Sequence, residues 1–428
     1  MYARKYVDGN RLRVEVERSY EKWIGERTVP PAGAAGDQEP DEEDKWESVN
    51  KNGIPNPTCT NARRAQRALG IRCRYDVFHD KVLVESKGIK PRVDLDHTVL
   101  ALRSKIHKAY KFDPGSVNTR DAILQLALEN EFDPVADYLD ALDWDGAPRL
   151  ERWAVTYLGA DDTELNREFG RLALIAAVRR VRHPGTKFDQ IIVLEGEGGT
   201  EKSMVIVIVC GEGNFCDQPI FGKHDKEQQE LLAGVWLYEI AELTGIRRAE
   251  MEHIKAFASR THDRARPAYG RTRIDRPRRC ILFATTNDQE YLKEDDRRFW
   301  PIRTTTINTE ALRRDRDQLW AEAAQREREG VSIVLRRDLW EVARVEQQAR
   351  EEHDPWDDKL ADLIGDRENG EERTTSADIL TDVLGIPISK QRDFDYKKLG
   401  RCMRRLGWTG PKKLRKGNRL AMGYTRPA

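Results

Sequence analysis

The sequence predicts an α/β protein with a helical N-terminal region, an α/β core and a basic C-terminal module. In residues 186–305 the apolar stretches "FDQIIVLEG", "GVWLYEIAEL", "RRCILFATTND" and "RFWPIRTTTI" alternate with polar connections, as in α/β cores. Residues 93–183 show helical spacing interrupted by the breakers "FDPGS", "EFDP", "WDGAP" and "HPG". Residues 386–428 contain 13 Lys and Arg but only two acids, so this end is strongly basic.

Composition limits the class of protein. The 428 residues suggest two to four domains, and the 74 Lys and Arg balance the 74 Asp and Glu, so net charge does not indicate a nucleic-acid partner. No apolar run approaches the roughly 18–20 residues that span a bilayer, so we expect no membrane partner. The six cysteines form no CxxC pair and the eight histidines are dispersed, which indicates a reducing cytoplasm and no Cys or His metal site.

The order of elements divides the chain into four parts. Residues 1–50 form an N-terminal segment and a flexible linker rich in Pro, Gly and acids. Residues 51–185 are mostly helical, with a helix at "NARRAQRALG", a hairpin at "RCRYDVFHDKVLVES" that turns at His79-Asp80, and a long helix at "REFGRLALIAAVRRVR". Residues 186–350 form the core, and residues 355–428 form a separate basic module.

One glycine-rich turn in the core is a candidate phosphate-binding loop. Residues 191–204 read "IIVLEGEGGTEKSM", an apolar strand that leads into a turn ending in Lys-Ser. In such loops backbone N–H groups converge on phosphate oxygens, a lysine reaches the β/γ-phosphates and a hydroxyl reaches Mg²⁺. An ordinary strand-to-helix turn is the alternative. The following "MVIVIVC" is β-branched, but we expect a helix there because burial overrides low propensity. The candidate nucleotide-binding residues are Gly196, Gly198, Gly199, Thr200, Lys202 and Ser203.

Two later strands end in polar residues that suit the same chemistry. "GVWLYEIAEL" carries Glu239 and Glu242, and an acid at a strand end can hold a magnesium-bound water while a second acid polarises the attacking water. "CILFATTND" leads to Thr285, Thr286 and Asn287, and a polar residue beside the phosphate loop can orient that water. Each stretch alone could be a buried strand entering a solvated turn. The three pieces occur in the right order, which is rarer by chance than any single piece.

Arginines dominate two further stretches of the core. "DDRRFWPIR" contains Arg297 and Arg298, and a guanidinium that reaches a neighbouring subunit's γ-phosphate accelerates related chemistry. A surface charge cluster is the alternative. "KAFASRTHDRARPAYGRTRIDRPRR" interleaves basic residues with an aromatic, which suits a surface that follows a nucleic-acid strand. The residues expected to contact DNA here are Lys255, Arg264, Arg266, Tyr269 and Arg271.

The C-terminal module has the outline of a winged helix. "SADILTDVLGI" predicts a helix capped by Ser376. "DYKKLGRCMRRLGW" predicts a second helix with Leu399, Met403 and Leu406 on one face, and "KKLRKGNRLAMGYTR" predicts a hairpin that turns at Gly417-Asn418. The second helix could enter a major groove while the hairpin touches phosphates. A basic helix that holds an acidic partner or the rest of the molecule is the alternative. The candidate DNA-binding residues are Lys397, Arg401, Arg404, Arg405, Lys413 and Arg415.

In combination these segments resemble the virulence-associated protein E family of phages, prophages and genomic islands, which is related to superfamily 3 replicative helicases. The resemblance covers roughly residues 50–350 and includes "GIPNPTCTNARRAQRALGIRCRYDVFHDK", "NEFDPVADYLDALDWDGAPRL", "VLEGEGGTEKS", "YEIAELTG", "KAFASRTHDRARPAYGR", "FATTND" and "RRFWPI". It implies an AAA+-like P-loop ATPase that uses ATP and Mg²⁺ and assembles as a hexamer-type homo-oligomeric ring. It also implies action on single-stranded or forked DNA, with a possible separate primase, in the cytoplasm of a bacterial host.

The resemblance assigns roles by position. Lys202 and Ser203 match the Walker A lysine and hydroxyl, and Glu239 and Glu242 match the Walker B acids, so that Ser203 and Glu239 would hold Mg²⁺ through the nucleotide. Asn287 matches the polar sensor. Arg298, with Arg297 second, matches the arginine finger, and the "KAFASRTHDRARPAYGR" stretch matches the loop that faces DNA in the channel of the ring.

Three departures from the family pattern bear on activity. Glu201 stands where the loop usually has glycine, "KEDDRRFW" lacks the Thr-Gly-Asn that usually precedes the paired arginines, and no N-terminal primase domain is visible. A carboxylate about 5 Å from a phosphate charge costs about 3 kcal/mol at an effective dielectric near 20, or about two decades of affinity. Glu201 could also pair with Lys202, and a positive φ there adds about 1 kcal/mol, unless its side chain points outward.

We therefore expect an intact fold with weakened ATP binding and hydrolysis. The first hypothesis is an ATP-driven helicase or translocase of a phage replication module. The second is a non-motor replication factor that binds DNA and whose ATPase site has decayed. A small-molecule P-loop kinase is the third, and it leaves the arginine-rich loop and the basic tail without a role.

Overall fold

The computed structural model describes residues 45–428, apart from 88–94, 244–245, 267–272, 294–295, 353, 369, 417–418 and 428. The predicted N-terminal segment and acidic linker lie almost wholly outside the described residues. The chain forms two compact units, one of residues 1–288 with 296–344 and the other of residues 289–295 with 345–428.

The first unit begins with helices packed on a small sheet. The predicted hairpin is confirmed: β1 (Arg72–Asp76) pairs antiparallel with β2 (Lys81–Glu85), and His79 and Asp80 lie in the turn. A two-residue strand that the sequence did not predict, β3 (Glu131–Phe132), adds parallel to β1. The helices of this region are α2 (Cys59–Ala68), α3 (Leu95–Tyr110), α4 (Gly115–Leu128) and α5 (Pro134–Asp140).

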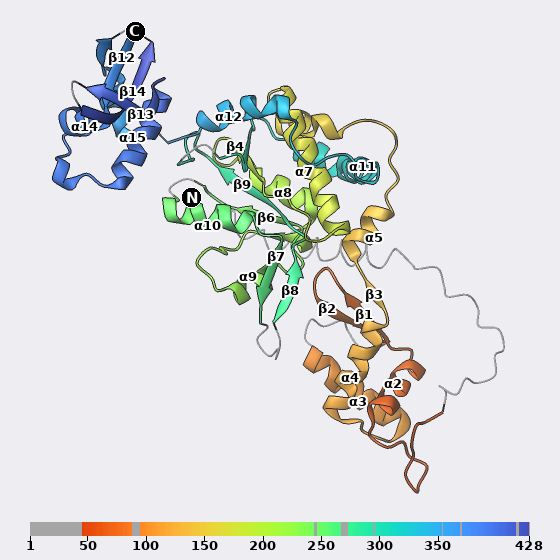
Figure 1. Cartoon of the computed structure of the whole chain (residues 1–428). Helices are drawn as coiled ribbons and strands as arrows, with labels where there is room; N and C mark the ends of the chain where they lie inside the picture. The colour runs from red at the N-terminus through yellow and green to blue at the C-terminus, as the bar shows by residue number, and fades with distance from the viewer. Residues whose placement is uncertain are drawn as a thin grey trace, which may run out of the picture. The chain divides into compact units, whose positions relative to one another are not determined.

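The core is a parallel five-stranded sheet in the order β10-β4-β9-β6-β5. All four apolar stretches noted in the sequence contribute a strand, which confirms the α/β class. The strands are β4 (Ile191–Glu195), β5 (Phe215–Cys216), β6 (Leu237–Ile240), β9 (Ile281–Thr286) and β10 (Phe299–Arg303). Because β4, β9 and β6 are parallel neighbours, their carboxyl ends lie at one edge of the sheet (Figure 1).

The helix after the glycine-rich turn forms as expected despite its β-branched sequence. α8 (Lys202–Cys210) buries Val205, Ile206, Ile208 and Val209. Burying each such side chain contributes about 1.5–3 kcal/mol. The helix-propensity cost of an ordinary residue relative to alanine is at most about 0.7 kcal/mol. Burial therefore outweighs propensity in this segment.

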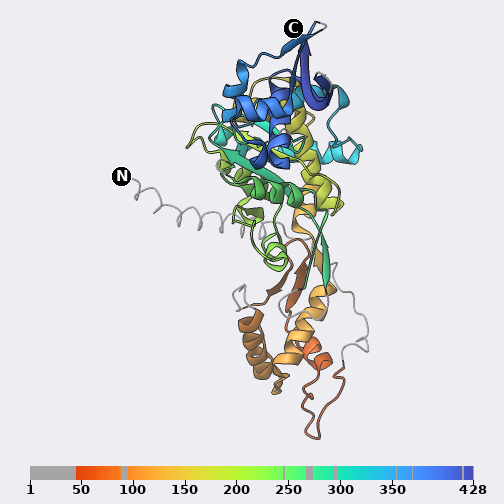
Figure 2. The ribbon, with the colours of Figure 1, turned by 60° about the vertical axis from the view of Figure 1, so that its left-hand side comes forward.

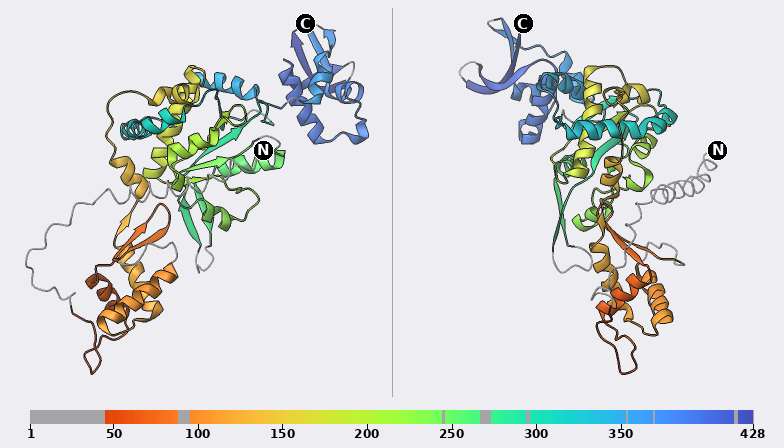
Figure 3. Two further views of the ribbon diagram at one scale, coloured as in Figure 1. Left: turned by 180° about the vertical axis from the view of Figure 1, so that it is seen from behind. Right: turned by 90° about the vertical axis from the view of Figure 1, so that its right-hand side faces the viewer.

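Two long helices complete the packing around α8. α7 (Glu164–Arg182) and α11 (Thr309–Arg328) contribute to one apolar cluster with α8 and the sheet (Figures 1 and 3). On α11, Trp320 stacks on Trp236 at a centroid distance of 4.2 Å and donates a hydrogen bond from Nε1 to Val209 O of α8 at 2.7 Å. The arginines at the end of α7 do more than face the helix dipole, because Arg180 is 1% exposed and donates to three backbone carbonyls.

The remaining elements of the first unit surround the sheet. A two-stranded antiparallel hairpin of β7 (His262–Ala265) and β8 (Ile274–Pro277) lies within the arginine-rich stretch (Figure 2). The helices are α6 (Trp153–Leu158), α9 (Asp225–Leu231) and α10 (Arg248–Ala258), with 3-10 turns at Leu150–Arg152, Glu212–Asn214 and Arg337–Leu339. α12 (Trp340–Gln348) spans the boundary of the two units.

The second unit is a four-stranded antiparallel sheet, in the order β11-β12-β14-β13, packed on helices (Figure 3). The paired strands β13 and β14 form the predicted hairpin, and its tip at residues 417–418 lies outside the described residues. Leu399 and Met403 are fully buried as expected. The elements are α13 (Pro355–Ala361), β11 (Asp366–Glu368), β12 (Glu371–Thr375), α14 (Ser376–Asp378), a π-helical turn at Ile379–Val383, a 3-10 turn at Ile388–Lys390, α15 (Asp393–Arg405), β13 (Thr409–Lys416) and β14 (Arg419–Pro427).

The N-cap of α14 differs from the prediction. Thr375, not Ser376, is the N-cap, and its Oγ1 accepts a hydrogen bond from Asp378 N at 3.2 Å. Ser376 is already helical and is 3% exposed. Both residues are good caps, so the sequence alone could not decide where the helix begins. Within the described part of the chain, no helix is long and apolar enough to cross a membrane.

Candidate functional site

The turn after β4 is shaped by two glycines. A Cβ on Gly196 would lie 2.7 Å from Thr304 Oγ1 and 3.0 Å from Thr304 O, so a side chain there would collide with the segment after β10. Gly199 has φ +82°, a backbone conformation that side chains disfavour. Thr200 closes the turn by donating from Oγ1 to Glu197 O at 2.9 Å. The turn thus leads directly from β4 into α8.

Lys202 lies inside this turn with its ammonium against the neighbouring strand. Its Nζ donates to Gly196 O at 2.9 Å, to Glu197 O at 2.7 Å and to Asn287 Oδ1 at 3.0 Å. Asn287 directly follows β9, the strand next to β4. The residue is 7% exposed, and this burial lowers the pKa of the Lys202 ammonium from its ordinary value, while the nearby Glu239 carboxylate acts in the opposite direction.

Ser203 connects the same turn to a second strand. Its Oγ donates to Glu239 Oε1 at 2.6 Å, and Glu239 lies on β6 with 1% exposure. Thr285 of β9 donates from Oγ1 to the same Oε1 at 2.7 Å. A carboxylate oxygen can accept more than one hydrogen bond, so the two hydroxyls fix this side chain at the sheet edge.

The structure therefore brings Lys202, Ser203, Glu239 and Asn287 to one place. They come from α8, β6 and the end of β9, and the parallel pairing of β4, β9 and β6 puts these ends side by side. The sequence pattern indicates Thr285 only as one of three polar residues, with Thr286 and Asn287, that could orient the water. Its hydrogen bond to Glu239 depends on the pairing of β6 with β9, which the sequence does not show.

Glu201 occupies the position before α8 in the left-handed conformation, with φ 63° and ψ 24°. Its Oε2 accepts a long hydrogen bond of 3.4 Å from Thr309 Oγ1, at the first turn of α11. Among the described residues Lys202 makes no ion pair with Glu201, so the expected diversion of the lysine is not seen. The positive φ that we allowed for is present, and the carboxylate points to α11 rather than to the lysine.

An arginine on α11 also lies close to this loop. Arg313 lies one helical turn after Thr309 and donates from Nη2 to Met204 Sδ at 3.4 Å. Met204 follows Ser203 on α8. Within the part of the chain that the structure describes, Arg313 has no carboxylate partner, and its side chain is exposed. None of the sequence motifs includes Arg313, because it follows the last of them.

The other predicted catalytic residues do not take part in the hydrogen bonds around Lys202 and Glu239. Glu242 follows β6 by two residues, is exposed and has φ 55°. Arg297 and Arg298 precede β10, whose first residue pairs with Ile191 at the start of β4, so they lie at the opposite edge of the sheet from Lys202. Arg297 bonds Asp189 at 3.0 Å, and Arg298 bonds Asp296 at 2.8 Å and Ser259 Oγ at 3.2 Å.

The residues predicted to face DNA in the core divide into three kinds. Arg264 on β7 is 65% exposed and pairs with Asp275, and Arg266 is exposed at the end of the same strand. Tyr269 and Arg271 lie outside the described residues. Lys255 corrects the prediction, because its side chain is 7% exposed and pairs with Glu252 at 3.1 Å and Asp296 at 3.3 Å, which leaves it no surface for a strand.

The basic residues of the second unit also divide. Arg405 pairs with Glu351 and Asp357 at 2.6 Å each and is 25% exposed, so the structure assigns it to holding α15 in place rather than to a free surface. Lys397, Arg404, Lys413 and Arg415 are exposed, and Arg401 is half-buried.

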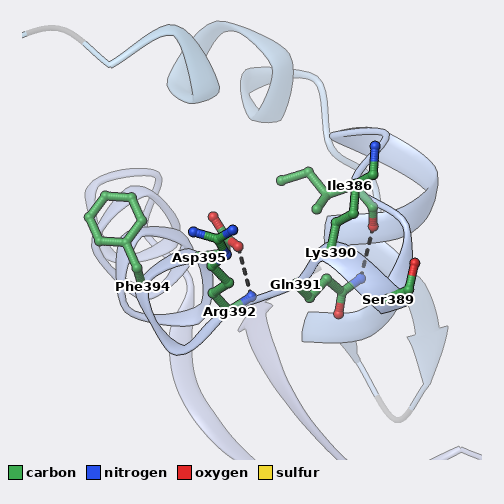
Figure 4. Close-up of a pocket in the computed structure, with 7 residues that line it drawn as sticks. All are labelled: Ile386, Ser389, Lys390, Gln391, Arg392, Phe394 and Asp395. Atoms are coloured by element: carbon green, nitrogen blue, oxygen red, sulfur yellow. Dashed lines mark hydrogen bonds between the residues drawn. The ribbon is translucent and has the colours of Figure 1, made fainter.

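At the beginning of α15 the residues Lys390, Arg392 and Phe394 line a cavity of about 530 Å³, and Phe394 is 55% exposed (Figure 4).

The donor set of the loop suits a nucleotide held through its phosphates. Two glycines and a left-handed Glu201 turn the backbone, Lys202 supplies a cation and Ser203 and Glu239 supply oxygens of the kind Mg²⁺ prefers. Among the described residues, no group of three or more His, Cys, Asp or Glu could hold a metal ion alone.

These features define an α/β protein with a strand–glycine-rich turn–helix element at the edge of a parallel sheet. The chain belongs to the virulence-associated protein E-like family: the model of the virulence-associated protein E-like domain matches residues 139–352, half of the chain. No curated protein matches the sequence.

The chain is similar to solved structures of the NrS-1 C-terminal region. The apo structure of that region is 9% identical to this chain, with a TM-score of 0.48, and covers 85% of this chain and 98% of its own. Its A form apo structure is 8% identical, with a TM-score of 0.47, and covers 86% of this chain and 99% of its own.

Proposed function

We propose that the chain is an ATP-dependent DNA helicase or translocase of a phage or mobile-element replication module, built on an AAA+-like P-loop core. The observation that carries the proposal is the meeting of Lys202 and Ser203 with Asn287 and Glu239. In a P-loop ATPase these are the groups that bind phosphate, Mg²⁺ and the attacking water. A simple strand-to-helix turn would have no need to bury a lysine and a glutamate at one sheet edge, because each costs free energy to desolvate.

In this proposal each side chain has one task. The loop N–H groups and Lys202 would bind the phosphates of ATP, and Ser203 and Glu239 would hold Mg²⁺, which would supply positive charge beside the phosphates. Asn287 orients the attacking water from the end of β9. Thr285 keeps the Glu239 carboxylate in position through its 2.7 Å hydrogen bond.

The position of the paired arginines supports an oligomer. A guanidinium at the sheet edge opposite Lys202 cannot serve its own nucleotide, but it can serve that of an adjacent subunit. Arg298, with Arg297 second, is therefore proposed as the finger in a hexamer-type ring. Asp296 and Asp189 would orient it through their ion pairs.

DNA binding is assigned to two exposed basic surfaces. Arg264 and Arg266, with Tyr269 and Arg271 in the same hairpin sequence, would follow a single strand or a fork. The second unit would act as a winged-helix-like module through Lys397, Arg404, Lys413 and Arg415. A separate primase would then supply the priming activity.

Glu201 is tolerated in this proposal because its charge is turned away. A carboxylate at the first turn of α11 faces the positive end of a helix dipole. Arg313, one turn further along α11, is close enough to α8 to offset the charge again. At roughly 10 Å from the phosphates, repulsion falls to about 1.7 kcal/mol, or little more than tenfold in affinity.

The test is ATP binding and DNA-stimulated ATPase of the natural chain, Glu201→Gln and Glu201→Gly, with the oligomeric state measured with and without nucleotide. Glu201→Gln removes the charge alone and should tighten ATP binding about tenfold. Glu201→Gly also relieves the positive φ and should be at least as tight. Unchanged affinity in both variants, with turnover of several per second in the natural chain, would show that Glu201 does not weaken the site.

The second candidate is a non-motor DNA-binding replication factor with a decayed ATPase site. Glu201 in the left-handed conformation favours it, since the backbone strain serves no evident purpose. DNA binding without ATP binding in the natural chain and in Glu201→Gly would support this candidate. Hydrolysis stimulated by DNA in the natural chain would exclude it.

A further inference from the structure

The turn between β1 and β2 lies against three elements of the nucleotide-site core. His79 Nε2 bonds Asn214 Oδ1 at 3.0 Å, just beyond the end of α8. Gly234, shortly before β6, donates from its N–H to Phe78 O at 3.1 Å, and a Cβ on Gly234 would lie 2.5 Å from His79 Cδ2. Asp80 forms an ion pair with Arg276 of β8.

The histidine is fixed on both sides. Its Nδ1 bonds Asp76 Oδ2 at 2.7 Å, and the same carboxylate accepts from the backbone N–H groups of Phe78 and His79. Asn214 Nδ2 donates to Cys210 O, the last residue of α8, at 2.8 Å. Because that amide nitrogen is already committed, Asn214 Oδ1 is the atom that faces the histidine, and Nε2 is the donor.

These contacts join the helix that begins at Lys202 to the hairpin that carries Arg264. A movement of α8 would be transmitted from Cys210 to Asn214 and on to His79 through hydrogen bonds of 3.0 Å or less. The same four-residue turn holds β8 through Asp80, and Tyr75 Oη donates to that carboxylate. The His79 and Asp76 side chains are 9% and 5% exposed, so this part of the link is shielded from water, whereas Asp80 and Arg276 are 37% and 33% exposed.

We infer that His79 and Asp80 are positioning residues that couple the nucleotide site to the arginine-rich hairpin, so that DNA at the hairpin changes the rate of ATP hydrolysis. The inference rests on the proposed function for the two activities it connects. It adds the route between them, which neither the loop nor the hairpin sequence indicates. Energetic coupling between two binding sites is reciprocal, so ATP should alter DNA affinity by the same link.

The experiment compares ATPase with and without single-stranded DNA in the full chain and in His79→Leu and Asp80→Ala. Both variants should lose fivefold or more of the stimulation by DNA, while basal ATPase and DNA affinity stay within about twofold. His79→Gln keeps a donor toward Asn214 and should retain most of the stimulation. Asp96→Ala is the control, since Asp96 pairs with Arg120 away from the turn.

A second readout is the change in DNA affinity on adding a non-hydrolysable ATP analogue, which the two coupling variants should also lose. Full stimulation and full ATP response in folded His79→Leu and Asp80→Ala would overturn the inference and leave the proposed function standing. A natural chain that shows neither stimulation nor an ATP response overturns both. If Asp96→Ala also lost the stimulation by DNA, the effect would be general destabilisation, and this result would overturn the inference too.

Discussion

Around Lys202 the polar groups lie within 3.3 Å of partners inside the site, whereas the basic residues of the C-terminal module divide between internal ion pairs and open surface. In the first region the partners come from the loop after β4, from β6 and from the end of β9, so burial and hydrogen bonding define one arrangement. In the second region the residues share one sequence pattern, and the fold alone separates Arg405 from Lys413. The grouping of residues predicted from the motifs therefore agrees with the structure better than the DNA-binding surface predicted from the number of basic residues.

The largest expected effect concerns the buried lysine. Lys202→Ala should weaken ATP binding by about a hundredfold or more, because a preorganised cation in a partly dry site is worth about 3 kcal/mol or more toward phosphate charge. Isothermal titration with ATP and Mg²⁺ measures this. Lys223→Ala, an exposed lysine on the same unit, is the control and should bind normally. Equal affinity in the two variants would remove Lys202 from the site.

The next prediction separates the two kinds of basic residue in the module. Lys413→Ala with Arg415→Ala should reduce the slope of log affinity for duplex DNA against log salt by about two, since each phosphate contact contributes about 0.9. The melting temperature of this double variant should not change. Arg405→Ala should leave the slope alone and cost about 1–3 kcal/mol in the free energy of unfolding of the module, because it deletes charged hydrogen bonds to Glu351 and Asp357. The reverse pattern would refute the division.

The smallest expected effect tests the contact between Thr285 and Glu239, which the sequence did not predict. Thr285→Val keeps the shape of the side chain but removes the hydrogen bond to Glu239, which is worth about 1–1.5 kcal/mol, so kcat for ATP should fall about tenfold. ATP affinity should stay within about twofold. Thr285→Ser restores the hydroxyl and should recover most of the rate. A Thr285→Val enzyme with normal kcat would show that Glu239 needs no such support.

The strands, the α8 helix and both hairpins could be predicted because their signals are local. Apolar runs of four to six residues, a glycine-rich turn and the His79-Asp80 turn each carry their own physical cause within a few residues. The helix α8 could also be predicted despite its β-branched residues, because burial of their side chains outweighs their low helix propensity. The small strand β3 and the cap at Thr375 escaped, since the first depends on a distant partner and the second on a choice between two good caps.

By itself the sequence determined the class of the fold, the order of the motifs and the identity of Lys202, Ser203, Glu239 and Asn287 as candidates. Only the tertiary structure decided that Thr285 supports Glu239, that Lys255 is buried, and that Glu201 turns toward Thr309. The physical reason is separation along the chain: Ser203 and Glu239 are 36 residues apart and Lys202 and Asn287 are 85 apart. Contacts between residues so far apart along the chain depend on which strands pair. The sequence of one strand does not specify which residue lies beside it on the neighbouring strand.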